Sequence, residues 1–174
     1  MTATKNPAFD IEALRFLVVE DHGFQRWVTG NLLEGMGAKH VYVAGDGRAA
    51  LEILAEVDPP IDVVISDLDM PGMDGMEFIR HVGESRAPVA LIVASALDRS
   101  LVASVEAMAR AYQVSLLGAM EKPATAKKLG ALLEGFSPAK TAVAPHVELM
   151  PATEIAEGCD AGNSRPSSSR KSRS

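Results

Sequence analysis

Residues 61–75 read Ile-Asp-Val-Val-Ile-Ser-Asp-Leu-Asp-Met-Pro-Gly-Met-Asp-Gly. The first six residues contain the apolar, β-branched run Val63-Val64-Ile65, and Asp67 follows them. Such a run predicts a strand that is covered on both faces, as in a parallel sheet. Acidic side chains and a Pro-Gly turn come next, so we expect chemistry at the carboxyl end of this strand.

Strand and helix patterns alternate on both sides of this stretch. Apolar runs predict strands at 14–19, 40–44, 61–66, 89–94 and 115–120. Helical spacing of apolar residues predicts helices at 24–36, 48–57, 75–82, 99–112 and 125–134. Five strand–helix units in order predict an α/β fold, a doubly wound five-stranded parallel sheet with helices on both faces.

The helix predicted at 24–36 carries its apolar residues at helical spacing. They are Trp27, Val28, Leu32, Leu33 and Met36. We expect Trp27 and Met36 to pack this helix against the sheet.

Composition divides the chain into three parts. Residues 14–135 hold all the predicted elements, and the 47 % of apolar residues in the chain suits one buried core. Residues 1–13 are read as an N-terminal extension. Residues 136–174 are rich in Pro and Ser and end in Ser, Arg and Lys, so we expect a largely disordered tail.

The chain is acidic, with a formal net charge of −6. Nucleic acid and anionic membrane are therefore not expected partners. The single cysteine, Cys159, excludes an internal disulfide, and no apolar run approaches the roughly 20 residues that span a bilayer. We expect a cytoplasmic location.

Polar residues stand at the ends of four of the five predicted strands. Glu20 and Asp21 follow the first strand, Asp67 the third, Ser95 the fourth and Lys122 the fifth. Because the carboxyl ends of parallel strands meet at one edge of a sheet, we expect these side chains to converge there. Their convergence predicts a functional site.

Three carboxylates in one pocket repel one another unless a cation lies between them. Mg²⁺ fits such a site, because it binds through one or two carboxylates, keeps water ligands and accepts phosphate oxygens. We assign Asp21 and Asp67 as direct ligands and Glu20 as a ligand through water. The backbone carbonyl of Asp69 is assigned as a further ligand.

A carboxylate in this setting can attack phosphorus and form an acyl phosphate, which makes Asp67 the candidate phosphoacceptor. The transferred group is highly charged, so its oxygens need positive or hydrogen-bonding neighbours. The Lys122 ammonium and the Ser95 hydroxyl are the candidates for that role. His40, His81 and His146 show no spacing typical of metal ligands.

Four stretches together resemble the signature of the response-regulator receiver (CheY-like) domain. They are residues 17–22 (Leu-Val-Val-Glu-Asp-His), 67–75, 94–96 (Ala-Ser-Ala) and 121–123 (Glu-Lys-Pro). The resemblance implies a flavodoxin-like sheet of strand order 2-1-3-4-5 and a cis peptide bond before Pro123. It also implies a two-component switch with a histidine kinase or phosphotransfer protein as phosphodonor and an unknown downstream protein target.

Enzyme activity beyond self-phosphorylation and autodephosphorylation at Asp67 is not implied by this resemblance. The family often has an aromatic switch residue where this chain has Ala119, and Asp69 and Leu97 hold positions that tune dephosphorylation in the family. The surface of residues 99–134 is a candidate homodimer face, as in many relatives.

Three other interpretations fit parts of the sequence. Asp67-Leu68-Asp69 imitates the Asp-x-Asp motif of haloacid-dehalogenase-type phosphatases, which place it on the first strand. A receiver fold that docks a partner without phosphorylation is the second interpretation. Residues 116–123 resemble receivers fused to EAL-type cyclic-di-GMP phosphodiesterases, and residues 152–158 resemble the entry helix of that missing effector domain.

Overall fold

The computed structural model describes residues 10–96 and 99–137. Predictions for most of the N-terminal extension, for Leu97 and for the tail from residue 138, including 152–158, lie outside the described residues. Within the described ranges, no helix combines the length and the apolar character that crossing a bilayer requires.

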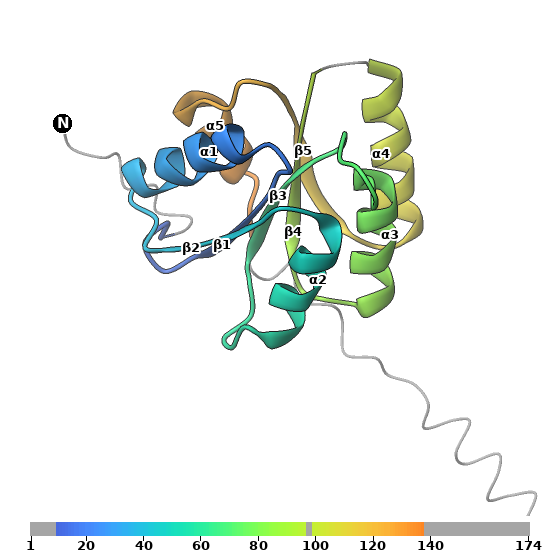
Figure 1. The fold of residues 1–174 in the computed structure, drawn as a ribbon, viewed down its shortest axis with the longest axis horizontal. Coiled ribbons are helices and arrows are strands. Elements are labelled where there is room, and N and C mark those ends of the chain that lie inside the picture. The colour runs from blue at the N-terminus through green and yellow to red at the C-terminus, as the bar shows by residue number, and fades with distance from the viewer. Residues whose placement is uncertain (1–9, 97–98, 138–174) are drawn as a thin grey trace, which may run out of the picture. The chain divides into compact units, whose positions relative to one another are not determined.

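Five parallel strands form one sheet in the order β2-β1-β3-β4-β5, as the sequence predicted (Figure 1). The strands are β1 (Arg15–Val19), β2 (His40–Ala44), β3 (Val63–Asp67), β4 (Ala90–Ser95) and β5 (Ser115–Glu121). The helices are α1 (Gly23–Gly35), α2 (Gly47–Glu56), α3 (Gly75–Ser85), α4 (Arg99–Ala111) and α5 (Ala126–Leu133). Asp67 and Ser95 are the last residues of their strands, and α3 runs three residues further than predicted.

Helices cover both faces of the sheet, and alternate strand residues supply the two cores. On one face Leu17 and Val64 pack with residues of α2, α3 and α4. On the other face Val18 and Ile65 pack with residues of α1 and α5. Figure 1 shows α2, α3 and α4 on one side and α1 and α5 on the other. This two-sided burial explains why β3 and β4 are apolar along most of their length.

The expectation that Trp27 packs in the core is wrong. Trp27 is 63 % exposed and stacks against Phe24, which is 68 % exposed, with ring centroids 6.2 Å apart. Helix α1 buries the stripe of Thr29, Gly30 and Leu33. At 3.6 residues per turn, Trp27 lies about 200° around the helix from Thr29, so it points away from the sheet. Met36 does pack against the α1–α5 core, as expected.

The turn after Asp67 is closed by two local features. Gly75 N–H donates to the carbonyl of Leu68, and a Cβ at position 75 would lie 2.6 Å from Leu68 Cα. The Asp74 side chain accepts from the amide of Glu77 and caps α3. The Asp67–Gly75 stretch therefore forms a tight turn that connects the end of β3 to the start of α3.

Candidate functional site

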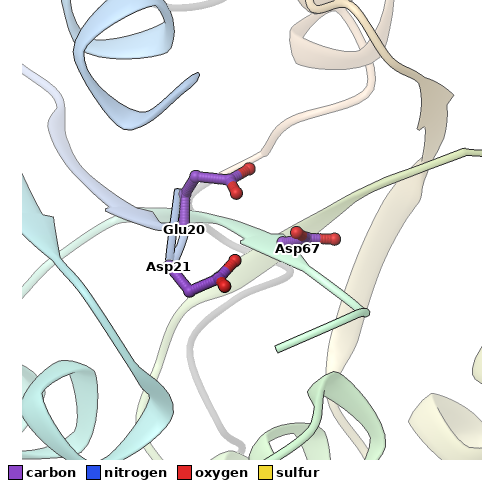
Figure 2. Close-up of side chains that lie close together, drawn as sticks. All are labelled: Glu20, Asp21 and Asp67. Atoms are coloured by element: carbon purple, nitrogen blue, oxygen red, sulfur yellow. The ribbon is translucent and has the colours of Figure 1, made fainter. Parts of the chain in front are cut away.

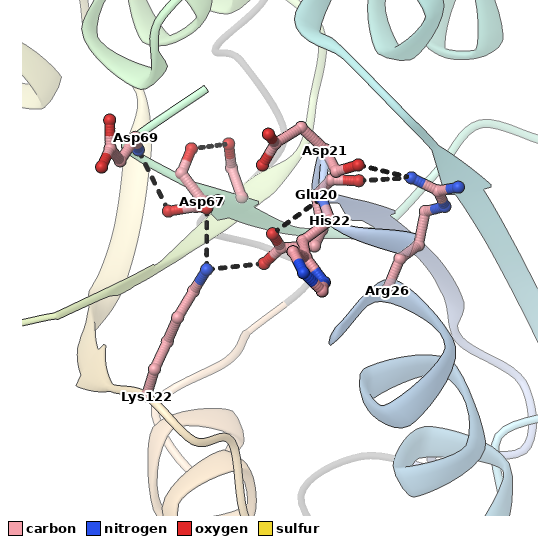
Figure 3. Close-up of polar contacts among 8 residues, drawn as sticks. Glu20, Asp21, His22, Arg26, Asp67, Asp69 and Lys122 are labelled. Carbon is pink, nitrogen blue, oxygen red and sulfur yellow. Dashed lines mark hydrogen bonds and ion pairs between the residues drawn. The ribbon is translucent and has the colours of Figure 1, made fainter. Parts of the chain in front are cut away.

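The carboxyl ends of the central strands bring the predicted site residues to one edge of the sheet. Register pairs Asp67 with Ala94 and pairs Ser95 with Glu121. Glu20 directly follows β1, and Lys122 directly follows β5. Residues that are up to 102 positions apart in the chain thus make direct contact (Figure 3).

Three carboxylates form the centre of the site. One oxygen from each of Glu20, Asp21 and Asp67 lies within 4.8 Å of the others (Figure 2). Glu20 and Asp67 are each 5 % exposed, whereas Asp21 is exposed. An all-oxygen donor set with one side open to water fits a hard cation that keeps part of its water shell, and Mg²⁺ is such a cation.

Lys122 joins two of these carboxylates. Its Nζ lies 2.7 Å from Glu20 Oε2 and 2.7 Å from Asp67 Oδ2. Burial alone would lower the pKa of Lys122, but the hydrogen bonds to Asp67 and Glu20 raise it overall. Burial also raises the pKa of Glu20, against the opposing hydrogen bond from Lys122. Three carboxylates and one ammonium leave negative charge at the site, which favours a further cation.

Both oxygens of Asp67 have a hydrogen-bond donor. Oδ2 accepts from Lys122 Nζ, and Oδ1 accepts from the backbone N–H of Asp69 at 3.0 Å. The Ser66 hydroxyl donates to the Asp67 carbonyl at 3.0 Å. These contacts hold the carboxylate in one orientation at the end of β3. The assignment of the Asp69 carbonyl as a metal ligand stays a prediction.

Arg26 is a site residue that the sequence analysis missed. Its Nη1 donates to the carbonyl of Glu20 at 2.7 Å and to that of Asp21 at 3.4 Å (Figure 3). The amide of His22 donates to Glu20 Oε1 at 3.2 Å and closes the same turn. Arg26 therefore ties α1 to the turn that carries both acids. One sequence feature could have pointed to Arg26, namely its position one helical turn after an acid pair. Many surface arginines have a similar position, so this feature is not specific.

Ser95 lies at the end of β4 and is 7 % exposed. Its carbonyl accepts from the amide of Lys122 at 3.0 Å, which extends the β4–β5 ladder to the lysine. The peptide bond between Lys122 and Pro123 is cis. Ser95 thus ends the strand beside β3, and Lys122 directly follows the next strand along the sheet.

Comparison with known proteins identifies the family. Residues 16–134 match the response regulator receiver domain. The chain belongs to this family. Receiver domains accept a phosphoryl group on an aspartate in two-component signalling, bind Mg²⁺ through an acidic pocket, and interact with kinases, phosphotransfer proteins and downstream targets.

Two curated relatives and one solved structure illustrate the match. The cyclic di-GMP phosphodiesterase RocR of Pseudomonas aeruginosa is 31 % identical over 144 residues, which make up 83 % of this chain but 36 % of RocR. A probable chemotaxis protein CheY of Rhizobium etli is 32 % identical over 126 residues, covering 71 % of this chain and 92 % of that protein. A response regulator from Colwellia psychrerythraea has a TM-score of 0.59 at 28 % identity, covering 70 % of this chain and 94 % of that chain.

The receiver match resolves one alternative from the sequence. The Asp67-Leu68-Asp69 stretch lies at the end of the third strand of a receiver sheet, and not on a first strand as in haloacid-dehalogenase-type phosphatases. The chain spans about a third of RocR and most of the CheY relative, so the activity of the longer relative does not transfer to it directly.

Proposed function

We propose that this receiver takes a phosphoryl group on Asp67 from a histidine kinase or phosphotransfer protein and thereby changes its binding to a downstream partner. The observation that carries the proposal is the contact of Asp67 with Lys122 at 2.7 Å inside the cluster of three carboxylates. Both oxygens of Asp67 accept hydrogen bonds from the strand-end loops, one from the Asp69 amide and one from the Lys122 ammonium.

The transfer needs one bond to form and one to break. An Asp67 carboxylate oxygen attacks phosphorus, and the bond from phosphorus to the donor nitrogen breaks, with the electron pair leaving on the donor imidazole. In this proposal the Lys122 ammonium neutralises one phosphoryl oxygen, and the Ser95 hydroxyl donates to another. Bound Mg²⁺ would supply further charge neutralisation. Glu20, Asp21, Asp67 and the Asp69 carbonyl are the proposed residues that hold it.

Loss of the phosphoryl group is proposed to occur by attack of water on phosphorus, with the Asp67 carboxylate as leaving group. The Asp69 side chain stands two residues after the acceptor and adds negative charge close to it. The proposal includes no enzyme activity beyond this phosphorylation cycle.

In this chain, phosphorylation of Asp67 must reach the α4–β5–α5 surface without an aromatic switch residue. Ala119, at the position of the family aromatic, is partly buried and packs against the α2–α3–α4 core. An alanine has no rotamer to flip, so we propose that the α4–β5–α5 surface responds through a shift of helix α4. The same surface is the candidate homodimer face.

The output partner is proposed from the likeness to RocR. A receiver that is 31 % identical to part of a cyclic di-GMP phosphodiesterase is a reasonable regulator of cyclic di-GMP turnover. Measuring the hydrolysis of cyclic di-GMP by a phosphodiesterase from the same cell, with and without the phosphorylated receiver, tests this second proposal. An unchanged rate in both states counts against it.

The decisive experiment is intact-mass spectrometry after incubation with acetyl phosphate and Mg²⁺. We expect the mass of one phosphoryl group to be added to the wild type and to Asp58→Asn, a matched change at an exposed acid. We expect no adduct on Asp67→Asn or in the presence of EDTA. An adduct on Asp67→Asn would show that the acceptor is a different residue.

Rapid dephosphorylation could hide an adduct, so a stable mimic is measured in parallel. Beryllofluoride with Mg²⁺ should produce saturable shifts of backbone amides around Asp67 and Ser95 in the wild type. If neither an adduct nor these shifts occur, the chain is a receiver fold that docks its partner without phosphorylation.

A further inference from the structure

A pocket of about 400 Å³ lies beside the acidic cluster, on the α1–α5 side of the sheet. Its walls come from the first two turns of α1, the ends of β1, β3 and β4, and the residues that link β5 to α5. This volume falls in the lower part of the range of roughly 300–1,000 Å³ that is typical of small-molecule sites. Glu20, Asp67 and Lys122 line one end of the pocket, so it borders the proposed phosphorylation site.

Most of the pocket lining is apolar. The buried side chains of Val18, Ile65 and Ala94 belong to the strand ends, and Val28 and Ala124 contribute from α1 and from the start of the β5–α5 link. Protein interiors normally fill such space with side chains. Phosphoryl transfer on Asp67 needs charged and polar groups, so it does not account for this apolar surface.

A buried hydroxyl group also faces the pocket. Thr29 lines it and is 9 % exposed, yet its hydroxyl makes no hydrogen bond within residues 10–96 and 99–137. A hydroxyl on a helix usually donates to the carbonyl one turn back, as Ser104 does to Ser100 at 3.0 Å. Since a buried polar group needs a partner, the Thr29 hydroxyl calls for one beyond the described residues.

Charge limits what can enter this pocket. Two carboxylates, from Glu20 and Asp67, line it with one ammonium, from Lys122, and the exposed Asp21 lies close by. An anionic ligand would meet net negative charge, whereas a neutral one would not. The exposed ring of Phe24 at the pocket adds a further apolar surface, against which an aromatic body can stack.

We propose that this pocket binds a small neutral organic molecule that has an apolar body and one hydroxyl group. The body lies among Val28, Ile65 and Ala94, and the hydroxyl pairs with Thr29. This site is distinct from the proposed metal and phosphoryl positions, and it requires no phosphorylation. Because Asp67 and Lys122 border both the pocket and the proposed phosphorylation site, a ligand in the pocket would lie against Asp67, the proposed phosphoacceptor.

The test uses three probes of similar shape, namely benzyl alcohol, toluene and benzoate, on the full ¹⁵N-labelled chain. Benzyl alcohol should cause saturable amide shifts centred on Val28, Thr29 and Ala124, with a Kd on the order of 1 mM, as expected of a ligand this small. Toluene should bind more weakly at the same residues. Benzoate should not bind, because its carboxylate would face Glu20 and Asp67.

Two variants separate the hydroxyl contact from the apolar contacts. Thr29→Val keeps the side-chain shape and should weaken benzyl alcohol about fivefold, the value of one neutral hydrogen bond, without changing toluene. Ala124→Leu should fill the pocket and remove the binding of both. Spectra that superimpose away from the pocket establish that each variant is folded.

Three results would overturn the proposal. They are the absence of saturable shifts with benzyl alcohol, equal binding of benzoate and benzyl alcohol, and shifts that persist in Ala124→Leu. Equal weakening of toluene and benzyl alcohol by Thr29→Val would overturn the assignment of the hydroxyl group.

Discussion

The ammonium of Lys122 lies 2.7 Å from the Asp67 carboxylate, although 55 residues separate the two in the chain. The same nitrogen lies 2.7 Å from Glu20, so one cation offsets two buried carboxylates. This bridge links the stability of the domain to the charge of its site, because removing the cation leaves buried like charges side by side.

Lys122→Met should lower the free energy of unfolding in EDTA by about 3 kcal/mol, near the lower end of values for broken buried ion pairs, because Lys122 is partly exposed. Mg²⁺ should bind the variant at least threefold more tightly, since a competing cation has been removed. Urea unfolding and calorimetric titration measure the two effects. Lys127→Met changes an exposed lysine and is the control. Equal changes in both variants would contradict this reading.

Mg²⁺ should stabilise the fold. A ligand that binds only the folded state at 100 times its Kd adds about 2.7 kcal/mol, so the thermal midpoint should rise with Mg²⁺ and fall again with EDTA. Asp21→Asn removes an exposed proposed ligand without disturbing the Lys122 bridge and should abolish most of the rise. A midpoint that is independent of Mg²⁺ in the wild type would argue against a metal site formed by these carboxylates.

Arg26→Gln should weaken Mg²⁺ binding about threefold to tenfold while costing about 1 kcal/mol of stability. The guanidinium bonds to the carbonyls of Glu20 and Asp21, and hydrogen bonds to charged groups are worth roughly 1.5–3 kcal/mol before solvent exposure reduces them. Arg80→Gln is the matched control, because Arg80 contacts Glu77, His81 and Glu84 of α3, which lie outside the acidic cluster. Titration of both variants with Mg²⁺ measures the effect. Equal affinities would show that Arg26 does not contribute to the Mg²⁺ site.

Gly118→Ala should destabilise the domain by about 1–3 kcal/mol. Gly118 has a φ of +151° and follows the register shift between β4 and β5. A Cβ at this position would lie 2.6 Å from Leu132 Cδ2. Gly130→Ala offers the contrast in α5, where a Cβ meets nothing within 4 Å, and should stabilise by about 0.5–1 kcal/mol. Denaturant unfolding of the pair tests the assignment, and the same sign for both would refute it.

Trp27→Gln should change the free energy of unfolding by no more than about 0.5 kcal/mol, as expected for a surface substitution. Trp27 is the single tryptophan of the chain and is 63 % exposed, so acrylamide should quench its fluorescence readily in the folded protein. Strong protection from quenching, released only on unfolding, would instead place Trp27 in an interface.

Local pattern was enough to predict the fold and the polar residues at the strand ends, but it missed Arg26. Hydrophobic periodicity and the residue preferences of turns depend on neighbouring residues. The five strands, the five helices and the polar residues at the strand ends could therefore be predicted from the sequence. Because all the strands are parallel, their carboxyl ends then meet at one edge of the sheet. The same reasoning failed for Trp27, because spacing shows that a helix has an apolar stripe but not which apolar residue lies outside it.

The sequence by itself therefore determined the α/β architecture, the acid pair after the first strand, and the acid, hydroxyl and lysine after the others. Only the tertiary structure decided that Lys122 bridges Glu20 and Asp67, that Arg26 holds the β1–α1 turn, and that a pocket lies beneath Thr29 and Ala124. Strand and helix periods are properties of neighbouring residues. Side-chain contacts and unfilled space depend on how segments far apart in the chain pack against one another.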